Sequence, residues 1–172
     1  MEKFQFYKSL YDRELNRRKD LDASVNLPLT ILGILITANT YLVKNLFPIQ
    51  TIFEIRFKHT LVILFFLIII FVILYLTKSY NNFFNGFKYR NIGNYITLRE
   101  YELSVEKYNI KPENSDRQID FDKQVLEKLI QIAENHCTIN DKRSYDLYIA
   151  KTGILFTIIM TIINYIFIAT IK

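Results

Sequence analysis

Residues Thr60 to Thr77 read TLVILFFLIIIFVILYLT, a stretch of 18 residues without a charged side chain. A helix of about 20 apolar residues crosses a hydrocarbon layer of about 30 Å, so this stretch predicts a membrane-spanning helix. Two further uncharged stretches are Leu27 to Val43, of 17 residues, and Thr152 to Ile171, of 20 residues. The sequence therefore predicts three transmembrane helices, of which the first is the shortest and the most polar.

The polarity of the remaining segments predicts an all-α integral membrane protein with three transmembrane helices and a small helical cytoplasmic domain. In chain order we expect a cytoplasmic amphipathic helix (1–26), a two-span transmembrane hairpin (27–78), the cytoplasmic helical domain (79–151) and the third transmembrane helix (152–172). In the first segment apolar side chains recur every three to four residues, for example at Phe4, Tyr7 and Tyr11. That helix either lies on the membrane surface or packs on the cytoplasmic domain.

Three helices are expected in the segment 79–151. Tyr80 to Tyr95 is rich in asparagine and aromatic residues and predicts a short helix that ends in a turn. A second helix is expected over 97–108. Asp116 or Asp120 then begins a third helix, which we expect to continue without a break into the last span.

The distribution of basic residues predicts the orientation in the membrane. The first 26 residues carry six Lys or Arg, whereas the connection between the first two spans carries three, namely Lys44, Arg56 and Lys58. Because cytoplasmic loops are enriched in Lys and Arg, we expect the N-terminus to be cytoplasmic. The net charge of +5 is typical of a protein that is attracted to anionic lipid. Nucleic acid is not an expected partner, since no basic motif with groove-reading geometry is present.

Residues that usually carry catalysis or bind metals are sparse. The two histidines, His59 and His136, fall on predicted opposite sides of the membrane. His136 and the single cysteine, Cys137, are neighbours on a predicted helix, where their side chains point about 100° apart. The four scattered glycines form no phosphate-binding loop. We therefore expect no catalytic residue, no metal, no cofactor and no enzymatic activity.

Polar residues inside the predicted spans form two stripes at helical spacing, which are candidate pore or assembly faces. They are Thr30, Gly33, Thr37 and Thr40 in the first span and Gly153, Thr157, Thr161 and Asn164 in the third. Small and hydroxyl-bearing side chains let helices approach and hydrogen-bond in a bilayer. Two interpretations stay open: the stripes face each other within one chain, or they meet further copies or line a pore. No span contains Asp, Glu, Lys or Arg, which argues against ion-coupled transport.

A run of aromatic residues follows the second span and is a candidate docking surface for a partner protein. Its members are Phe83, Phe84, Phe87, Tyr89 and Tyr95. The alternative is an ordinary small-domain core or an aromatic belt at the membrane interface.

The order of segments resembles a known group of proteins. A basic N-terminal helix, YKSLYDRELNRRKDLDASVNLP (7–28), precedes a close pair of spans, and a helical part ends in ENHCTINDKRSYDLYIAKTG (134–153). This layout resembles small bacterial membrane proteins of antiphage systems, in particular the SLATT group of two-span effectors, from which the third span is a departure. The resemblance implies an inner-membrane effector that oligomerises, is held silent by a regulatory protein or nucleotide sensor, and permeabilises the membrane. It implies no catalytic residue.

Two hypotheses about function follow. In the first, the protein is a homo-oligomeric effector of antiviral defence that permeabilises the lipid bilayer or forms a pore in it. In the second, it is a membrane-anchored adaptor or subunit whose aromatic segment docks a cytoplasmic partner. A homomeric ring favours the first hypothesis, and a monomer that needs another protein for stability favours the second.

Overall fold

The computed structural model describes residues 2–44 and 52–170, with side chains at 3–42 and 59–167. Two expectations fall outside this range. The basic side chains of the connection between the first two spans, at Lys44, Arg56 and Lys58, and the terminal residues of the predicted third span, Ile171 and Lys172, are not among those described. The predicted orientation therefore stays a prediction.

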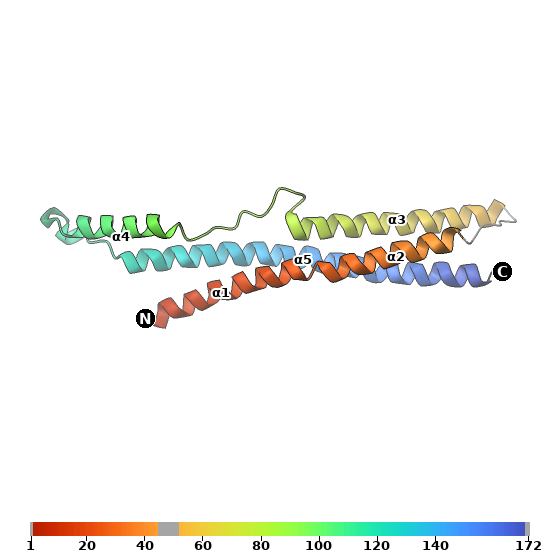
Figure 1. Ribbon diagram of the computed structural model, residues 1–172, viewed down its shortest axis with the longest axis horizontal. Coiled ribbons are helices and arrows are strands. Elements are labelled where there is room, and N and C mark those ends of the chain that lie inside the picture. The colour runs from red at the N-terminus through yellow and green to blue at the C-terminus, as the bar shows by residue number, and fades with distance from the viewer. Residues whose placement is uncertain (1, 45–51, 171–172) are drawn as a thin grey trace. The chain divides into compact units, whose positions relative to one another are not determined.

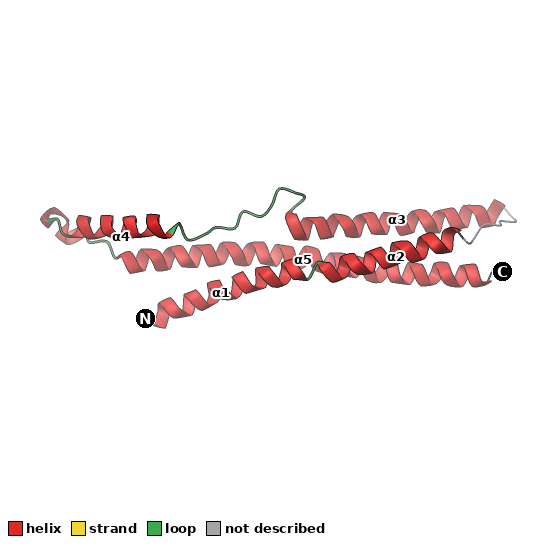
Figure 2. Cartoon of the chain, viewed as in Figure 1, coloured by secondary structure: helices red, strands yellow, loops and turns green. Residues whose placement is uncertain are grey.

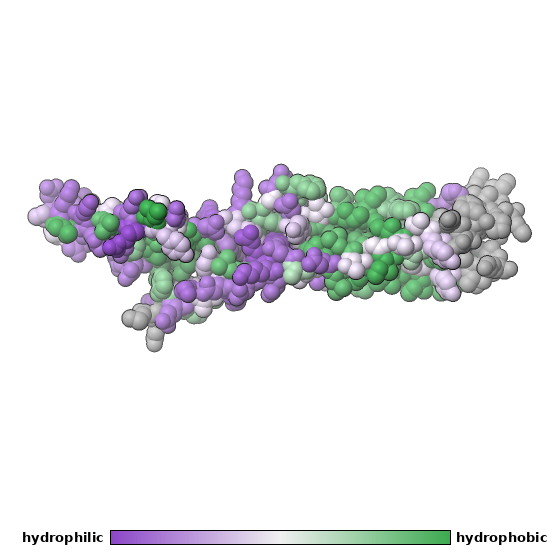
Figure 3. All heavy atoms as spheres, in the orientation of Figure 1, coloured by the Kyte–Doolittle hydropathy of each residue, from purple (hydrophilic) through white to green (hydrophobic). Residues whose placement is uncertain are grey.

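The described residues form helices and connections and contain no strand (Figures 1 and 2). The elements are α1 (Glu2–Ala23), α2 (Asn26–Lys44), α3 (Ile52–Asn81), α4 (Tyr95–Asn109), the short 3₁₀ helix η1 (Pro112–Arg117) and α5 (Phe121–Thr170). Helical stretches long and apolar enough to cross a membrane lie within Lys3–Leu42, His59–Asn81 and Pro112–Phe167. The all-α fold with three such helices is confirmed. Hydrophobic residues cover α3 and the C-terminal part of α5 in the view of Figure 3.

The chain divides into two compact units, which we describe separately. The first unit comprises Met1–Arg18 and Lys88–Asn140, and the second comprises Lys19–Phe87 and Asp141–Lys172. The helices α1 and α5 each contribute residues to both units. The four segments expected from polarity have boundaries inside α2, α3 and α5, and their assignment to sides of a membrane stays a prediction.

In the second unit, α2, α3 and the C-terminal part of α5 pack side by side around one apolar core. The buried positions of α3 alternate at spacings of four and three, at Phe65, Ile69, Val72, Leu76 and Ser79. This repeat is that of helices packed as a left-handed coiled coil. The core is continued by residues of the other helices, including Leu32, Leu35, Leu147, Ala150 and Ile154.

The first unit joins the start of α1 to α4 and to the N-terminal half of α5. Leu129 and Ile132 of α5 and Val105 of α4 are buried in it. The turn between α4 and α5 is closed by Asn109, whose amide donates to the Ile119 carbonyl at 2.8 Å and accepts from the Ile119 amide at 2.9 Å. One asparagine thus satisfies two backbone groups that a turn would otherwise leave unpaired.

The prediction of a short helix over Tyr80 to Tyr95 is wrong. α3 continues to Asn81, after which Asn82, Phe83 and Phe84 adopt positive φ angles of 45°, 54° and 73°. Consecutive left-handed residues end a right-handed helix. A turn at 82–85 follows, and residues 86–94 are not helical.

The two later helices agree better with the sequence. α4 begins at Tyr95, two residues before the predicted start. Of the two predicted starts for α5, Asp120 is the right one, because its carboxylate accepts a hydrogen bond from the Lys123 amide at 3.0 Å, as an N-cap residue does. The expectation of an unbroken helix into the last apolar stretch is confirmed, since α5 extends from residue 121 to residue 170.

Candidate functional site

The stripe expected on the last span lies inside the second unit. Gly153, Thr157 and Asn164 are buried, and Thr161 is partly buried. The hydroxyl of Thr157 donates to the Gly153 carbonyl at 2.9 Å, and that of Thr161 donates to the Thr157 carbonyl at 2.8 Å. This stripe therefore packs the bundle and satisfies its own hydrogen bonds.

Asn39 of α2, which was not among the predicted site residues, connects this stripe to α2. Its Nδ2 donates to Thr161 Oγ1 at 2.6 Å, and its Oδ1 accepts from Asn164 Nδ2 at 3.1 Å. A cavity of about 100 Å³ lies beside this cluster and is lined in part by Phe65 and Phe66. Polar side chains within apolar helices associate by such hydrogen bonds. Asn39 has helical spacing with Leu32 and Leu35, which lie on the buried face of α2. This spacing was the signal for Asn39 in the sequence, although the more conspicuous Thr40 lies directly next to it.

The stripe expected on the first span lies on the side of α2 that faces away from the core of the bundle. Thr30, Gly33, Thr37 and Thr40 are all exposed on the outer face of α2. The three hydroxyls donate to carbonyls of their own helix, at 3.1, 2.9 and 2.8 Å. A Cβ atom built at Gly33 would meet nothing within 4 Å. Thr40 and Asn164 line the same small cavity, but the other residues of the first stripe lie away from the last span. The interpretation that the two stripes face each other within one chain is therefore wrong for most of their length.

The outer faces of the other two apolar helices differ from that of α2. Those of α3 and α5 carry large apolar side chains, including Leu67, Ile70 and Leu74 on α3 and Phe156, Ile159 and Ile163 on α5. The opposite side of α3 is buried, and Val72 on that side packs against Gly153. The outer side of α2 carries a row of small and hydroxyl-bearing residues beside exposed large side chains, which include Leu29, Ile34 and Tyr41.

A charged cluster lies in the second unit near the end of α3, away from the cluster of Asn39 and Asn164. The side chain of Arg143 is buried, its Nε donates to the Ser79 carbonyl at 2.8 Å, and its Nη2 donates to Asp22 Oδ1 at 2.5 Å. Lys78 Nζ donates to Asp146 Oδ1 at 2.8 Å. The cluster ties the end of α1, through Asp22, to α3 and α5 at the point where the apolar faces of α3 and α5 end. Buried charges are tolerated when each is paired and hydrogen-bonded, as here.

A third polar cluster lies in the first unit around His136. The imidazole is buried, Nε2 lies 2.7 Å from the Arg90 carbonyl, and the rings of Tyr11 and Tyr89 are 5.5 and 4.8 Å away. Because a carbonyl only accepts, Nε2 is the donor. Among the buried side-chain N and O atoms of the described residues, His136 Nδ1 has no hydrogen-bond partner.

The residues next to this histidine are also paired. The amide of Asn140 donates to the Glu14 carbonyl and carboxylate at 2.9 and 3.1 Å, and it accepts from the Tyr89 hydroxyl at 2.8 Å. In the part of the chain that the structure describes, no group of three His, Cys, Asp or Glu side chains could hold a metal ion. The cluster around His136 therefore contributes packing and hydrogen bonds to the first unit.

The five predicted docking aromatics do not form one surface. Phe84 and Tyr95 are exposed, at 84% and 90% of their surface, and Phe83 is also exposed. Phe87 lies against the Arg143 guanidinium, 4.9 Å from its ring centroid, and Tyr89 is stacked by Arg18 at 4.3 Å. Phe87 thus packs within the second unit and Tyr89 within the first.

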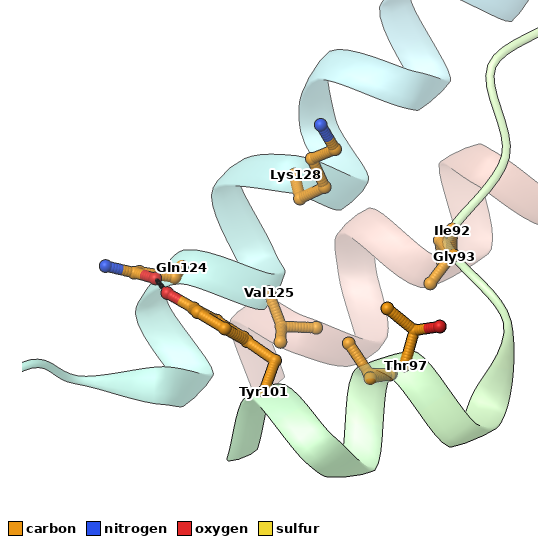
Figure 4. A pocket seen from close by; sticks show the side chains of 8 residues that line it. Ile92, Gly93, Thr97, Tyr101, Gln124, Val125 and Lys128 are labelled. Atoms are coloured by element: carbon orange, nitrogen blue, oxygen red, sulfur yellow. Dashed lines mark hydrogen bonds between the residues drawn. The ribbon is translucent and has the colours of Figure 1, made fainter. Parts of the chain in front are cut away.

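A pocket of about 340 Å³ lies in the first unit between α4 and α5 (Figure 4). Leu98 and Val125 form part of its apolar wall, and Lys128 lies at its edge. The Tyr101 hydroxyl is hydrogen-bonded to the Gln124 side chain across one end. It is a concave apolar surface with a few polar groups, as ligand and peptide sites usually are.

No known protein family matches this sequence, and no curated protein or solved structure is similar to the chain. Conclusions about function therefore depend on the surfaces and clusters described above.

Proposed function

We propose that this chain is a membrane-embedded effector of the bacterial inner membrane that acts by homo-oligomerisation and permeabilises the bilayer on a partner or nucleotide signal. The three apolar helices span the bilayer, with the N-terminus in the cytoplasm. The antiviral context comes from the resemblance in layout to antiphage membrane effectors.

The observation that carries the proposal is the outer face of α2. In lipid there is little hydrophobic drive for helices to associate, so close contact through small residues and hydrogen bonds decides where they meet. Gly33 has open space around it, and Thr30, Thr37 and Thr40 surround it on the outer side of an apolar helix. The occupant of this face is a second copy of the chain, which brings the same small residues to the contact.

The packing of the second unit supports assembly as the route to a pore. Phe65, Val72 and Ala150 fill the space between α2, α3 and α5. Because packed side chains occupy the interior of one bundle, a conducting path needs several copies. In such a ring the hydroxyl-bearing face of α2 is the surface suited to contact water or a neighbouring helix.

The experiment is a paired measurement of assembly and flux. We expect wild-type protein in nanodiscs to have the mass of a closed oligomer and to release ions from liposomes. Gly33→Phe places a ring in the contact and should convert the oligomer to monomer and lower the flux at least about tenfold, the factor that corresponds to a loss of 1.4 kcal/mol.

The matched control is Ile70→Phe on the outer face of α3, which is exposed and faces lipid in the proposal. It should leave both mass and flux unchanged. Equal behaviour of the two variants, or a wild-type monomer without flux, would contradict the proposal.

The second candidate function is that of a membrane-anchored adaptor or subunit. It is favoured by the exposure of Tyr95 and Ile96 at the start of α4 and by the pocket between α4 and α5. In that case the first unit docks a cytoplasmic protein. A wild-type monomer without flux that gains stability from a co-purifying protein, and loses that protein in Tyr95→Ala, would favour this function.

A further inference from the structure

A groove opens on one side of the second unit, where α1 is followed by α2 and where α3 ends. Its volume is about 650 Å³, and its apolar walls are formed by Val25, Leu29, Ile73 and Leu76. Every residue that lines it belongs to the second unit. We call it the α2–α3 groove.

The lining of the α2–α3 groove changes from polar to apolar along its length. Asp22 precedes Leu29 in the chain, whereas Asn81 follows Ile73. The two helices are antiparallel in Figure 1, so the polar ends of both walls coincide. A groove with one polar end and one apolar end, in a bundle whose helices α3 and α5 have apolar outer faces, has the polarity of a lipid in one leaflet.

One carboxylate dominates the polar end. Asp22 is the charged residue in the lining, and its side chain keeps 47% of its surface exposed although Oδ1 is held by the buried Arg143 at 2.5 Å. The carboxylate is therefore fixed in position while part of it still faces outward. Tyr80 and Asn81, which line the same groove, supply a hydroxyl and an amide that can donate hydrogen bonds.

We propose that the α2–α3 groove binds a bilayer phospholipid whose headgroup carries a primary amine. The ammonium lies at Asp22, the phosphate lies near Tyr80 and Asn81, and an acyl chain follows Leu29 and Ile73. The proposal rests on the membrane placement in the proposed function. A primary ammonium donates hydrogen bonds to the exposed part of the Asp22 carboxylate, whereas a quaternary ammonium has no N–H to donate and a glycerol headgroup has no positive charge.

The test is native mass spectrometry of the full-length chain released from nanodiscs with equal amounts of ethanolamine, choline and glycerol phospholipids. We expect one retained ethanolamine lipid per chain, preferred about tenfold over the choline lipid, as for a hydrogen bond to a charged group. Ile73→Trp fills the groove and should lower retention by a similar factor. Leu74→Trp is the control, because Leu74 is exposed like its neighbour but does not line the groove.

A third variant tests the headgroup. Asp22→Asn should keep the lipid in the groove but equalise the ethanolamine and choline forms. Equal retention by the two tryptophan variants, or equal retention of all three lipids by wild type, overturns the proposal. Oligomer mass and ion flux on the same samples test the proposed function separately. If the chain is not recovered with the membrane fraction, both proposals fail.

Discussion

Two glycines with opposite surroundings show how much one residue decides in this molecule. Gly153 faces the core, where an added Cβ would come within 2.5 Å of Val72 Cγ2. Gly33 faces outward and has open space. Val72 is β-branched and buried, so it cannot swing away from an added methyl group.

Alanine at these two positions should therefore have effects of opposite sign. Gly153→Ala should lower the free energy of unfolding in detergent by about 1–3 kcal/mol through overpacking. Gly33→Ala should raise it by about 0.5–1 kcal/mol, since alanine is the better helix former. Thermal or denaturant unfolding of the two variants, measured in the same detergent, provides the comparison.

The double variant Gly153→Ala, Val72→Ala checks the mechanism. Because removal of the valine methyl groups makes room for the new one, the double variant should be less destabilised than the sum of its single variants. Additive effects would show that Val72 is not the obstacle.

The sequence indicated two stripes of polar residues but not the direction in which they face, and it did not single out Asn39. Both stripes have helical spacing, and spacing alone does not say which side of a helix meets its neighbours. The buried positions of α3 and α5 define that side, and they place Asn39, rather than Thr37 or Thr40, opposite Asn164. The buried pairing of Arg143 joins residues far apart in the chain and had no local signal.

Among the elements, the end of α3 is the most unusual. Asn82, Phe83 and Phe84 have positive φ angles, which cost an L-residue other than glycine roughly 1–2 kcal/mol. Gly86 shares the left-handed conformation and carries no such penalty. The strain presents Phe83 and Phe84 outward at the end of an apolar helix, where aromatic rings suit a membrane interface.

Two substitutions of the same residue separate the backbone from the side chain. Phe84→Gly and Phe84→Ala both remove the ring, but only glycine adopts a φ of 73° without cost. We expect the glycine variant to be more stable than the alanine variant by about 1 kcal/mol. The measurement is the difference in unfolding free energy in detergent, and a more stable alanine variant would contradict the strain.

The helices themselves were largely predictable because their signals are local. Uninterrupted apolar runs predicted the three long helices, and one of the two predicted starts of α5, Asp120, is correct. The segment after α3 was not predictable in the same way. Its aromatic and asparagine residues fit a helix by spacing, whereas α3 ends in a turn that is closed by a hydrogen bond from the Gly86 amide to the Asn81 carbonyl.

For the chain as a whole, the proposed function assigns folding to the inner polar face and assembly to the outer one. Asn164 holds Asn39 inside the bundle, whereas Thr37 lies outside it. A change on the inner face should alter stability, and a change on the outer face should alter the number of copies that associate.

Leucine at each position tests this separation. Asn164→Leu leaves the side-chain oxygen of Asn39 without the donor at Asn164. The substitution should lower the free energy of unfolding by about 1 kcal/mol. Thr37→Leu should leave stability unchanged but reduce the oligomer and the ion flux. The measurements are unfolding in detergent, mass in nanodiscs and flux in liposomes. A loss of stability in Thr37→Leu with an intact oligomer would reverse the assignment of the two faces.

The partners of the charged cluster also set an order of events during synthesis. Ser79 and Arg143 are separated by 64 positions, and at roughly 5–20 residues per second the ribosome needs several seconds to make that interval. Throughout that delay the carboxylate of Asp22 and the ammonium of Lys78 have left the ribosome without Arg143 and Asp146. The contacts of α5 with α2 and α3 can therefore form only after the last helix has been made.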